Sequence, residues 1–368
     1  MLGLPTETVY GLAADAENDL AVAHIFQAKG RPADHPLIVH VAGVGCVGHF
    51  AAQVPDFADQ LMQAFWPGPL TLILLRRPGV ASAAAGGHDT IGLRCPSHPV
   101  AQALLRALLN DAGRTALDSS QGGQTPFGSG ISKLDDKELE SDPHSDSRLV
   151  WGLAAPSANQ FGRVSPTTAE HVQGEFGPDL LILDGGACTV GIESTIIDCT
   201  RGQPVLLRPG AITRAQAQAA CGLQVLLKEE LLTHAAPAPK ASGTLESHYA
   251  PSARVRLMDA PSLQAALALW VVDEAAIGPA AHAAVATRAN APTLPTIAVY
   301  ARSIAPSRSP QLLTKRMPID AAAAAHELFA VLRQLDAQGV QQIWIEAPPA
   351  GAEWDGVRDR LQRAAHAD

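Results

Sequence analysis

Two short segments near the start of the chain combine polar and charged side chains with glycine and proline. Residues 5–12 read P-T-E-T-V-Y-G-L, and their hydroxyl groups could hold a small polar ligand at the end of a short apolar run. Residues 29–32 read K-G-R-P, so Lys29 and Arg31 lie on a turn that glycine loosens. Two cations one residue apart suit a polyphosphate or a carboxylate, with Arg as a fork and Lys as a point charge. The structural alternatives are an ordinary turn and a helix end whose cations complement the helix dipole.

Four further segments place polar residues where an expected strand begins or ends, although each also fits a plain turn. In A-P-S-A-N, Ser157 and Asn159 follow the expected strand 153–155 and present a hydroxyl and an amide two residues apart. Ligands of open α/β sheets collect beyond the carboxyl ends of strands, which favours this loop as a binding segment. The other three segments are G-I-E-S-T-I at 191–196, L-R-P-G at 207–210 and S-H-Y-A-P at 247–251.

The elements that must position these segments alternate between helix and strand over residues 1–222, which predicts one α/β domain. The helix over 214–221 follows Thr213 and ends at Gly222. Thr167 has Glu170 at capping-box spacing before a helix over 168–176. The other helices are expected over 20–28 and 99–109, and strands over 36–41, 70–75, 91–94, 153–155, 180–183, 194–198 and 205–208.

Two stretches interrupt the alternation. Residues 112–148 are rich in Gly, Ser, Asp and charge, which predicts a mobile surface insertion. Residues 223–252 contain several Pro and Ser and no long periodic segment, which predicts a linker. A smaller α/β pattern then predicts a second domain over 253–368 with a parallel sheet. Its strands are expected over 254–257, 284–287, 296–299 and 342–346, and its helices over 262–272, 321–338 and 357–366.

The composition narrows the class of protein. The chain has 368 residues and a net charge of −9 without a long basic run, which argues against a large nucleic-acid surface. Its five cysteines form no C-x-x-C pair, which argues against a zinc module or disulfide framework and favours a reduced, cytoplasmic setting. No apolar run reaches the ~18 residues of a membrane helix, so we expect no membrane association. Neither a P-loop, a G-x-S-x-G nor an H-E-x-x-H motif occurs, so an enzyme here needs a less common site.

The order and spacing of the motifs are far more specific than any one of them. Along the first 251 residues the chain carries P-T-E-T-V-Y-G-L, K-G-R-P, P-L-I-V-H, W-P-G-P-L-T, I-G-L-R, A-P-S-A-N, G-I-E-S-T-I-I-D, L-R-P-G and S-H-Y-A-P. This series resembles the Sua5/YrdC/YciO family in its two-domain Sua5 form. The resemblance implies a YrdC-like twisted mixed sheet with helices, a linker over the active site and a small Rossmann-like α/β domain. In the C-terminal domain it rests on architecture and on D-R-L at 359–361.

The resemblance also implies an activity. Similar proteins combine L-threonine, bicarbonate or CO2, and ATP, and they release pyrophosphate and threonylcarbamoyl-AMP for N6-threonylcarbamoyladenosine at position 37 of tRNA. It therefore implies a nucleotidyltransferase with ATP as substrate and Mg²⁺ accompanying the triphosphate, without a dedicated protein metal site. A downstream complex transfers the threonylcarbamoyl group to tRNA, and weak RNA binding is compatible with this role. Because two anions must meet, we expect cations and oriented donors to do most of the catalysis.

The family pattern implies roles for residues by position. It implies that Lys29 and Arg31 are catalytic. The threonine pocket is implied at Thr6, His40, Arg94 and Ser194, with Arg94 pairing the amino-acid carboxylate. The ATP-binding residues are implied to be Lys29, Arg31, Thr90, Ser157, Asn159, Ser165, Arg208, His248 and Tyr249.

One departure and three alternative functions stay open. Members normally carry a helix and most of a strand before P-T-E-T-V-Y, whereas residues 1–4 precede it here, so we expect a misassigned start or a truncated chain. Single-domain relatives are associated with binding double-stranded RNA, against which the acidic balance argues. Hydrogenase-maturation proteins that share the domain transfer carbamoyl groups, but they carry zinc-finger cysteines whose spacing does not occur here. A purely regulatory protein is the third alternative.

Overall fold

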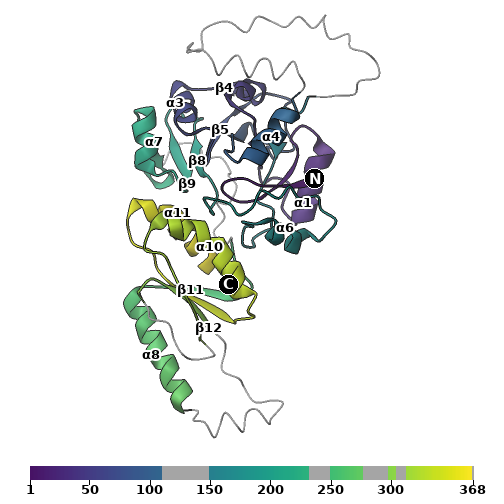
Figure 1. The fold of residues 1–368 in the computed structure, drawn as a ribbon. Helices are drawn as coiled ribbons and strands as arrows, with labels where there is room; N and C mark the ends of the chain where they lie inside the picture. The colour runs from purple at the N-terminus through teal and green to yellow at the C-terminus, as the bar shows by residue number, and fades with distance from the viewer. Residues whose placement is uncertain (110–148, 232–248, 277–296, 304–311, 367–368) are drawn as a thin grey trace, which may run out of the picture.

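The computed structural model describes residues 1–109, 149–231, 249–276, 297–303 and 312–366. They form two α/β units, each built on its own sheet (Figure 1). The predicted insertion 112–148, the expected strand 284–287 and most of the predicted linker, including His248, lie outside the described residues.

The larger sheet has ten strands of mixed direction, in the order β1-β2-β7-β3-β6-β5-β8-β9-β10, with β4 paired to β5. Three neighbouring pairs, β3 with β6, β5 with β8 and β9 with β10, run parallel. The mixed direction confirms the predicted class of sheet. The strands are β1 Leu2–Leu4, β2 Gly11–Asp15, β3 Ile38–His40, β4 Ala51–Gln53, β5 Leu70–Arg76, β6 Thr90–Arg94, β7 Leu153–Ala154, β8 Thr195–Asp198, β9 Val205–Arg208 and β10 Leu226–Leu227.

Two helices of the larger unit begin and end at local sequence signals. Helix α7 (Arg214–Cys221) begins at Thr213, which forms a capping box with Gln216, and ends at Gly222 with a φ of 67°. Helix α1 (Asp19–Lys29) ends at Gly30, also in the left-handed region. The remaining helices are α2 Val47–Phe50, α3 Asp56–Phe65, α4 Pro99–Ala107 and α6 Ala169–Phe176, with 3₁₀ turns η1 Val44–Cys46 and η2 Lys228–Glu230.

Some local predictions are wrong or incomplete. The strand expected over 180–183 is only an isolated bridge between Ile182 and Gly3. Helix α6 is capped by Thr168, whose hydroxyl accepts from the backbone N–H of His171, and not by Thr167. Strands β2 and β13 and helix α3 were not predicted, although α3 buries Phe57, Ala58, Leu61 and Met62 at helical spacing.

The smaller sheet has four parallel strands in the order β11-β14-β12-β13, which confirms the predicted small parallel sheet. The division of the chain at residues 222 and 253 stays a prediction. The elements are β11 Arg254–Met258, α8 Ala260–Ala276, β12 Ile297–Ala301, β13 Leu312–Arg316, α10 Ala321–Asp336, β14 Gln342–Glu346, η3 Ala352–Trp354 and α11 Asp355–Ala365.

Helices α10 and α11 lie between the two sheets, whereas α8 lies on the far side of the smaller sheet (Figure 1). One buried apolar cluster joins Val9, Ile192 and Tyr249 to α10 and α11 residues such as Phe329 and Leu361. The two units therefore share a core, and its removal from water stabilises their contact. No helix in the described part of the chain combines the length and apolar character needed to cross a membrane.

Candidate functional site

A small pocket lies where the two units meet, and most of the motif segments contribute to it. It encloses about 40 Å³. Polar and charged side chains from distant parts of the chain face one another there. Its lining residues are Thr6, Thr8, Val9, Gly11, Arg31, Ile38, His40, Arg94, Ala155, Pro156, Ser157, Glu193, Ser194, Arg208 and Tyr249.

The four residues implied for a threonine pocket all line this cavity. His40 ends β3 and Arg94 ends β6, and the parallel pairing of these strands sets the two residues side by side. Thr6 donates its hydroxyl to the carbonyl of Val9 (2.6 Å), which holds the turn before β2. Ser194 precedes β8, and its Oγ lies 2.7 Å from Thr71 Oγ1. The sheet register thus brings hydroxyl groups, an imidazole and a guanidinium to one place.

Arg94 is held by two residues whose roles the sequence analysis did not assign. Its Nη2 lies 2.6 Å from Glu7 Oε1, and its Nη1 donates to Thr8 Oγ1 at 2.7 Å. Arg94 and Glu7 are both buried. Both partners belong to the P-T-E-T-V-Y segment. The sequence feature that could have identified them is an acidic residue between two hydroxyl residues.

His40 is neutral in this environment. Burial, and then the positive charge of Arg94, lower its pKa from 6.5 to about 3. Its Nδ1 is buried and has no hydrogen-bond partner among the described residues. Buried polar atoms are normally paired, so this nitrogen is suited to a ligand in the pocket.

Three of the residues implied to bind ATP line the same pocket, namely Arg31, Ser157 and Arg208. Burial lowers the pKa of Arg31 to about 10, so its side chain still carries a full positive charge at neutral pH. Its Nη2 donates to the carbonyl of Pro36 (2.9 Å). Arg208 donates from Nε to the carbonyl of Ser194 (3.0 Å) and from Nη2 to its hydroxyl (3.1 Å). The pocket is therefore lined by three arginines, counting Arg94, and suits an anionic ligand.

Two further predicted residues lie behind the lining. Lys29 is the buried last residue of α1, and its Nζ donates to the carbonyls of Ser157 (2.5 Å) and Asn159. Burial, and then Arg31, lower the pKa of Lys29 to about 7. The amide of Asn159 donates to the carbonyls of Gln160 and Arg163, at 2.7 and 2.9 Å. Lys29 and Asn159 therefore shape the loop that carries Ser157.

Ser165 and Thr90 differ in their distance from the pocket. Ser165 donates its hydroxyl to Glu193, which lines the pocket, so Ser165 acts on the site through that carboxylate. Thr90 begins β6, four residues from Arg94, which is roughly 13 Å along a strand. Thr90 does not line the pocket, and its implied contact with ATP stays a sequence prediction.

Tyr249, near the C-terminal end of the predicted linker, also lines the pocket. It is buried, and its φ of 64° lies in the left-handed region that non-glycine residues seldom adopt. Its ring packs on Phe329 of α10 at 5.3 Å between centroids and lies under the guanidinium of Arg360 of α11 at 5.5 Å. Such a backbone conformation persists only where the surroundings over-determine it, so the contacts with the smaller unit hold Tyr249 in place.

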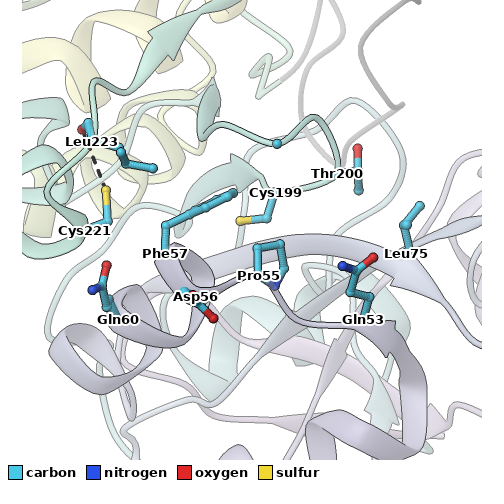
Figure 2. Close-up of a pocket in the computed structure, with 11 residues that line it drawn as sticks. Gln53, Pro55, Asp56, Phe57, Gln60, Leu75, Cys199, Thr200, Cys221 and Leu223 are labelled. Atoms are coloured by element: carbon cyan, nitrogen blue, oxygen red, sulfur yellow. Dashed lines mark hydrogen bonds between the residues drawn. The ribbon is translucent and has the colours of Figure 1, made fainter. Parts of the chain in front are cut away.

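A larger cavity of about 580 Å³ lies elsewhere, at the other end of β8 (Figure 2). It is lined by residues of β4, α3 and the segment after β8, including Asp56, Phe57 and Cys199. None of the predicted site residues lines it. Size alone would favour this cavity, but the smaller pocket gathers the charged side chains and His40 Nδ1, which has no hydrogen-bond partner among the described residues, so it is the candidate site.

Comparisons with known proteins agree with the motif series. The Sua5/YciO/YrdC family model, described as "Telomere recombination", matches residues 1–210. A model described as "Threonylcarbamoyl-AMP synthase, C-terminal domain" matches residues 212–366. The crystal structure of Pyrococcus abyssi Sua5 complexed with L-threonine is similar, with a TM-score of 0.73 and 29% identity over 99% of this chain and 89% of that one.

Curated relatives carry the name threonylcarbamoyl-AMP synthase. The Pyrococcus abyssi protein is 37% identical over 71% of this chain and 65% of its own length, and the Bacillus subtilis protein is 37% identical over 70% and 63%. This chain thus spans a little under two thirds of these two relatives. The Schizosaccharomyces pombe protein is 31% identical over 99% of this chain and 84% of its own length. On these matches, which extend over both units, this chain belongs to the Sua5/YciO/YrdC family in its two-domain Sua5 form.

Proposed function

We propose that this protein is a threonylcarbamoyl-AMP synthase. The threonine amine bonds to the carbon of CO2 and releases a proton, giving a carbamate. A carbamate oxygen then attacks the α-phosphorus of ATP, and pyrophosphate leaves with the electrons of the broken P–O bond. The products are threonylcarbamoyl-AMP and pyrophosphate.

The observation that carries the proposal is the pocket in which three arginines meet hydroxyl groups and a neutral imidazole. Arg31, Arg94 and Arg208 line it together with Thr6 and Ser194. In this reaction a carboxylate, a carbamate and a triphosphate must approach one another, so the barrier is largely electrostatic. Preorganised cations lower such a barrier because they need no reorganisation during the reaction.

We assign the threonine side to Thr6, His40, Arg94 and Ser194. Arg94 would bind the carboxylate of threonine while Glu7 and Thr8 fix its orientation. His40 Nδ1 is available for a polar group of the substrate. A neutral imidazole there can exchange hydrogen bonds without adding a charge.

We assign the nucleotide side to Arg31, Ser157 and Arg208, with Tyr249 as the cover. Lys29, Asn159 and Ser165 would support this side from behind, since they donate to the loops and to the carboxylate that border the pocket. A closed cover excludes water, which protects a labile mixed anhydride from hydrolysis. His248 is proposed as a second cover residue on its position beside Tyr249 alone.

Mg²⁺ is proposed to enter with the triphosphate as part of the substrate. Among the described residues, no group of three or more His, Cys, Asp or Glu is placed to hold a metal ion. Glu193, which lines the pocket, and Glu7, which holds Arg94, are already in ion pairs with arginines. These residues therefore do not make a resident metal site, and the cation would neutralise phosphate charge when the nucleotide binds.

The product is proposed to pass to a separate complex that transfers the threonylcarbamoyl group to adenosine 37 of tRNA. Threonylcarbamoyl-AMP is an activated acyl compound, so it needs an acceptor soon after it leaves the closed pocket. The net charge of −9 is consistent with an enzyme that acts on small molecules and does not itself bind the tRNA strongly.

The test measures pyrophosphate release with ATP, threonine and bicarbonate present, and then with each one omitted. We expect release only with all three, and we expect threonylcarbamoyl-AMP in equal amount by mass spectrometry. Serine and glycine replace threonine in a second series, and Arg94→Gln is the variant control. Equal release without threonine or without bicarbonate would show that the protein has another activity.

A further inference from the structure

Arg360, in helix α11 of the smaller unit, has a fully buried side chain that reaches the border of the pocket. Only 1% of this residue is exposed. Its Nε lies 2.9 Å from Glu193 Oε2, and its Nη2 donates to the carbonyl of the same residue at 3.0 Å. Its Nη1 donates to the carbonyl of Pro209 (2.7 Å) and to Asp359 Oδ2 (2.9 Å). One guanidinium therefore joins two segments of the larger unit.

Both segments carry residues of the pocket. Glu193 is followed by Ser194, and Pro209 follows Arg208. Arg208 itself bonds the hydroxyl and carbonyl of Ser194. Arg360 thus fixes, from behind, the two segments whose side chains meet in the pocket.

The fit between α10, α11 and these segments depends on glycine. A Cβ on Gly191 would lie 2.3 Å from the carbonyl oxygen of His326 in α10. A Cβ on Gly356 of α11 would lie 2.8 Å from Ile192 Cδ1 and 3.1 Å from the carbonyl oxygen of Gly210. Because these backbones are in such close contact, the segments that carry Gly191 and Gly210 cannot follow a different path. Helices α10 and α11 therefore determine the conformation of these segments.

Charge gives Arg360 a second effect. Glu193 lines a pocket that we propose to bind anions, and an unpaired carboxylate there would repel them. Burial alone would raise the pKa of Glu193, but Arg360 and then Arg208 outweigh it, so the pKa is lowered and the carboxylate is ionised. Without Arg360, this buried charge would lose its direct partner and act on the substrates and on Arg208.

We infer that Arg360 is a positioning residue through which the smaller unit completes the active site. It orients the Glu193–Ser194 and Arg208–Pro209 segments and neutralises Glu193. The pocket thereby keeps a net positive charge that favours the binding of threonine and ATP. The inference rests on the proposed function for the identity of the ligands. It gives the smaller unit a defined part in substrate binding.

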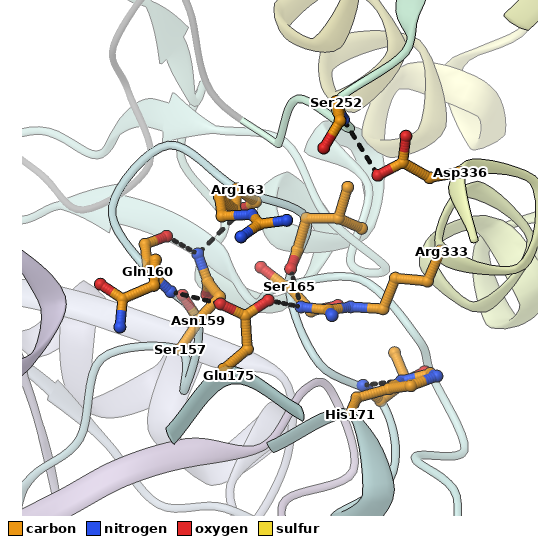
Figure 3. Close-up of polar contacts among 12 residues, drawn as sticks. Ser157, Asn159, Gln160, Arg163, Ser165, His171, Glu175, Ser252, Arg333 and Asp336 are labelled. Carbon is orange, nitrogen blue, oxygen red and sulfur yellow. Dashed lines mark hydrogen bonds and ion pairs between the residues drawn. The ribbon is translucent and has the colours of Figure 1, made fainter. Parts of the chain in front are cut away.

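A second arginine of the same unit contacts the segment that carries Asn159 and Ser165 (Figure 3). Arg333 of α10 lies 2.8 Å from Glu175 Oε1 and also donates to the carbonyls of Val164 and Ser165. Glu175 Oε2 accepts from the backbone N–H of Gln160 (2.9 Å), next to Asn159. The smaller unit therefore holds the nucleotide-side loop as well, which agrees with the role given to Arg360.

The experiment compares Arg360→Gln with the double variant Arg360→Gln/Glu193→Gln in the full chain. We expect the single variant to lose ~10²-fold in kcat/KM for both substrates, mainly through higher KM, since removing one partner of a buried pair leaves an uncompensated charge. We expect the double variant to recover at least ~10-fold, because the stranded carboxylate is gone. A purely structural role would instead lower the melting temperature of the single variant and leave the KM of the folded protein unchanged.

Arg302→Gln is the matched control, since Arg302 pairs with the buried Glu346 inside the smaller unit. It should leave KM unchanged.

Thermal melting shows that each variant is folded, and Arg360→Lys replaces the single variant if Arg360→Gln does not fold. Calorimetry measures threonine and ATP binding in parallel. Two outcomes would overturn the inference alone. One is a folded Arg360 variant with wild-type affinity and KM. The other is a double variant whose kcat/KM is no higher than that of the single variant. A wild-type protein that binds neither threonine nor ATP would overturn the proposed function with it.

Discussion

Arg94 Nη2 and Glu7 Oε1 lie 2.6 Å apart in the pocket, and both side chains are buried. A guanidinium fixed in this way presents its remaining donors in a set direction. The pair thus combines an internal ion pair with a candidate contact for the carboxylate of threonine. It also makes the site sensitive to the loss of either partner, because a buried charge without a partner is strongly destabilising.

Arg94→Gln should weaken threonine binding by ~10- to 100-fold, since hydrogen bonds to charged groups contribute about 1.5–3 kcal/mol. It should also lower the free energy of unfolding by about 3–5 kcal/mol, because Glu7 stays buried and unpaired. Arg94→Gln/Glu7→Gln should recover stability without recovering threonine affinity. Calorimetry and urea unfolding measure the two effects. The more exposed pair of Arg214 and Glu230 provides a control, and Arg214→Gln should change stability far less than Arg94→Gln does.

Arg31→Ala and Lys29→Ala should differ in their effects. Arg31 lines the pocket, so its loss should lower kcat/KM by ~10²-fold or more with the fold kept. Lys29 donates to two carbonyls of the Ser157–Asn159 loop, so its loss should lower both activity and the melting temperature. Arg106→Ala, at an exposed position of α4, is the control. A stable, fully active Arg31→Ala protein would move the phosphate contact elsewhere.

His40 should make folding sensitive to acid. Its pKa is about 3 when folded and near 6.5 otherwise, so the unfolded chain takes up the proton first as the pH falls. The stability that depends on neutral His40 is complete above pH 6.5 and is lost towards pH 3. Between pH 6.5 and 5 the loss should reach up to about 2 kcal/mol, at about 1.4 kcal/mol per pH unit. Urea unfolding of His40→Gln should show a shallower pH slope than the wild type, while His24→Gln, at an exposed position of α1, should not.

The insertion 112–148 should be dispensable for chemistry. The residues that flank it are close together, since the backbone N–H of Val150 donates to the carbonyl of Leu108 at 3.4 Å. A short Gly-Ser connection can therefore close the gap without moving α4 or β7. The shortened protein should keep its rate of pyrophosphate release and its melting temperature. A folded but inactive shortened protein would show that the insertion contributes to the site.

The sequence by itself determined the family, the two α/β units and most pocket-lining motifs. Signals confined to a few neighbouring residues were also readable, as with Thr213 and Gly222 at the two ends of α7. Such signals depend on hydrogen bonds within one turn of backbone, so they do not require the rest of the fold. Thr167 shows the limit, because its hydroxyl lies near the ring of His171 and Thr168 caps the helix instead.

Only the tertiary structure decided which motif residues face one another. The sheet register sets His40 beside Arg94 and leaves Thr90 at the far end of β6. The direction of the Lys29 side chain, towards carbonyls 128 and 130 residues away, has no local signal. Arg360 and Glu193 form an ion pair although 167 residues separate them in the sequence. Both side chains are buried, and each charge stabilises the ionised form of the other. Pairings of this kind follow from the packing of whole elements, because the Coulomb energy between two side chains depends on their distance in space and not on their separation in sequence.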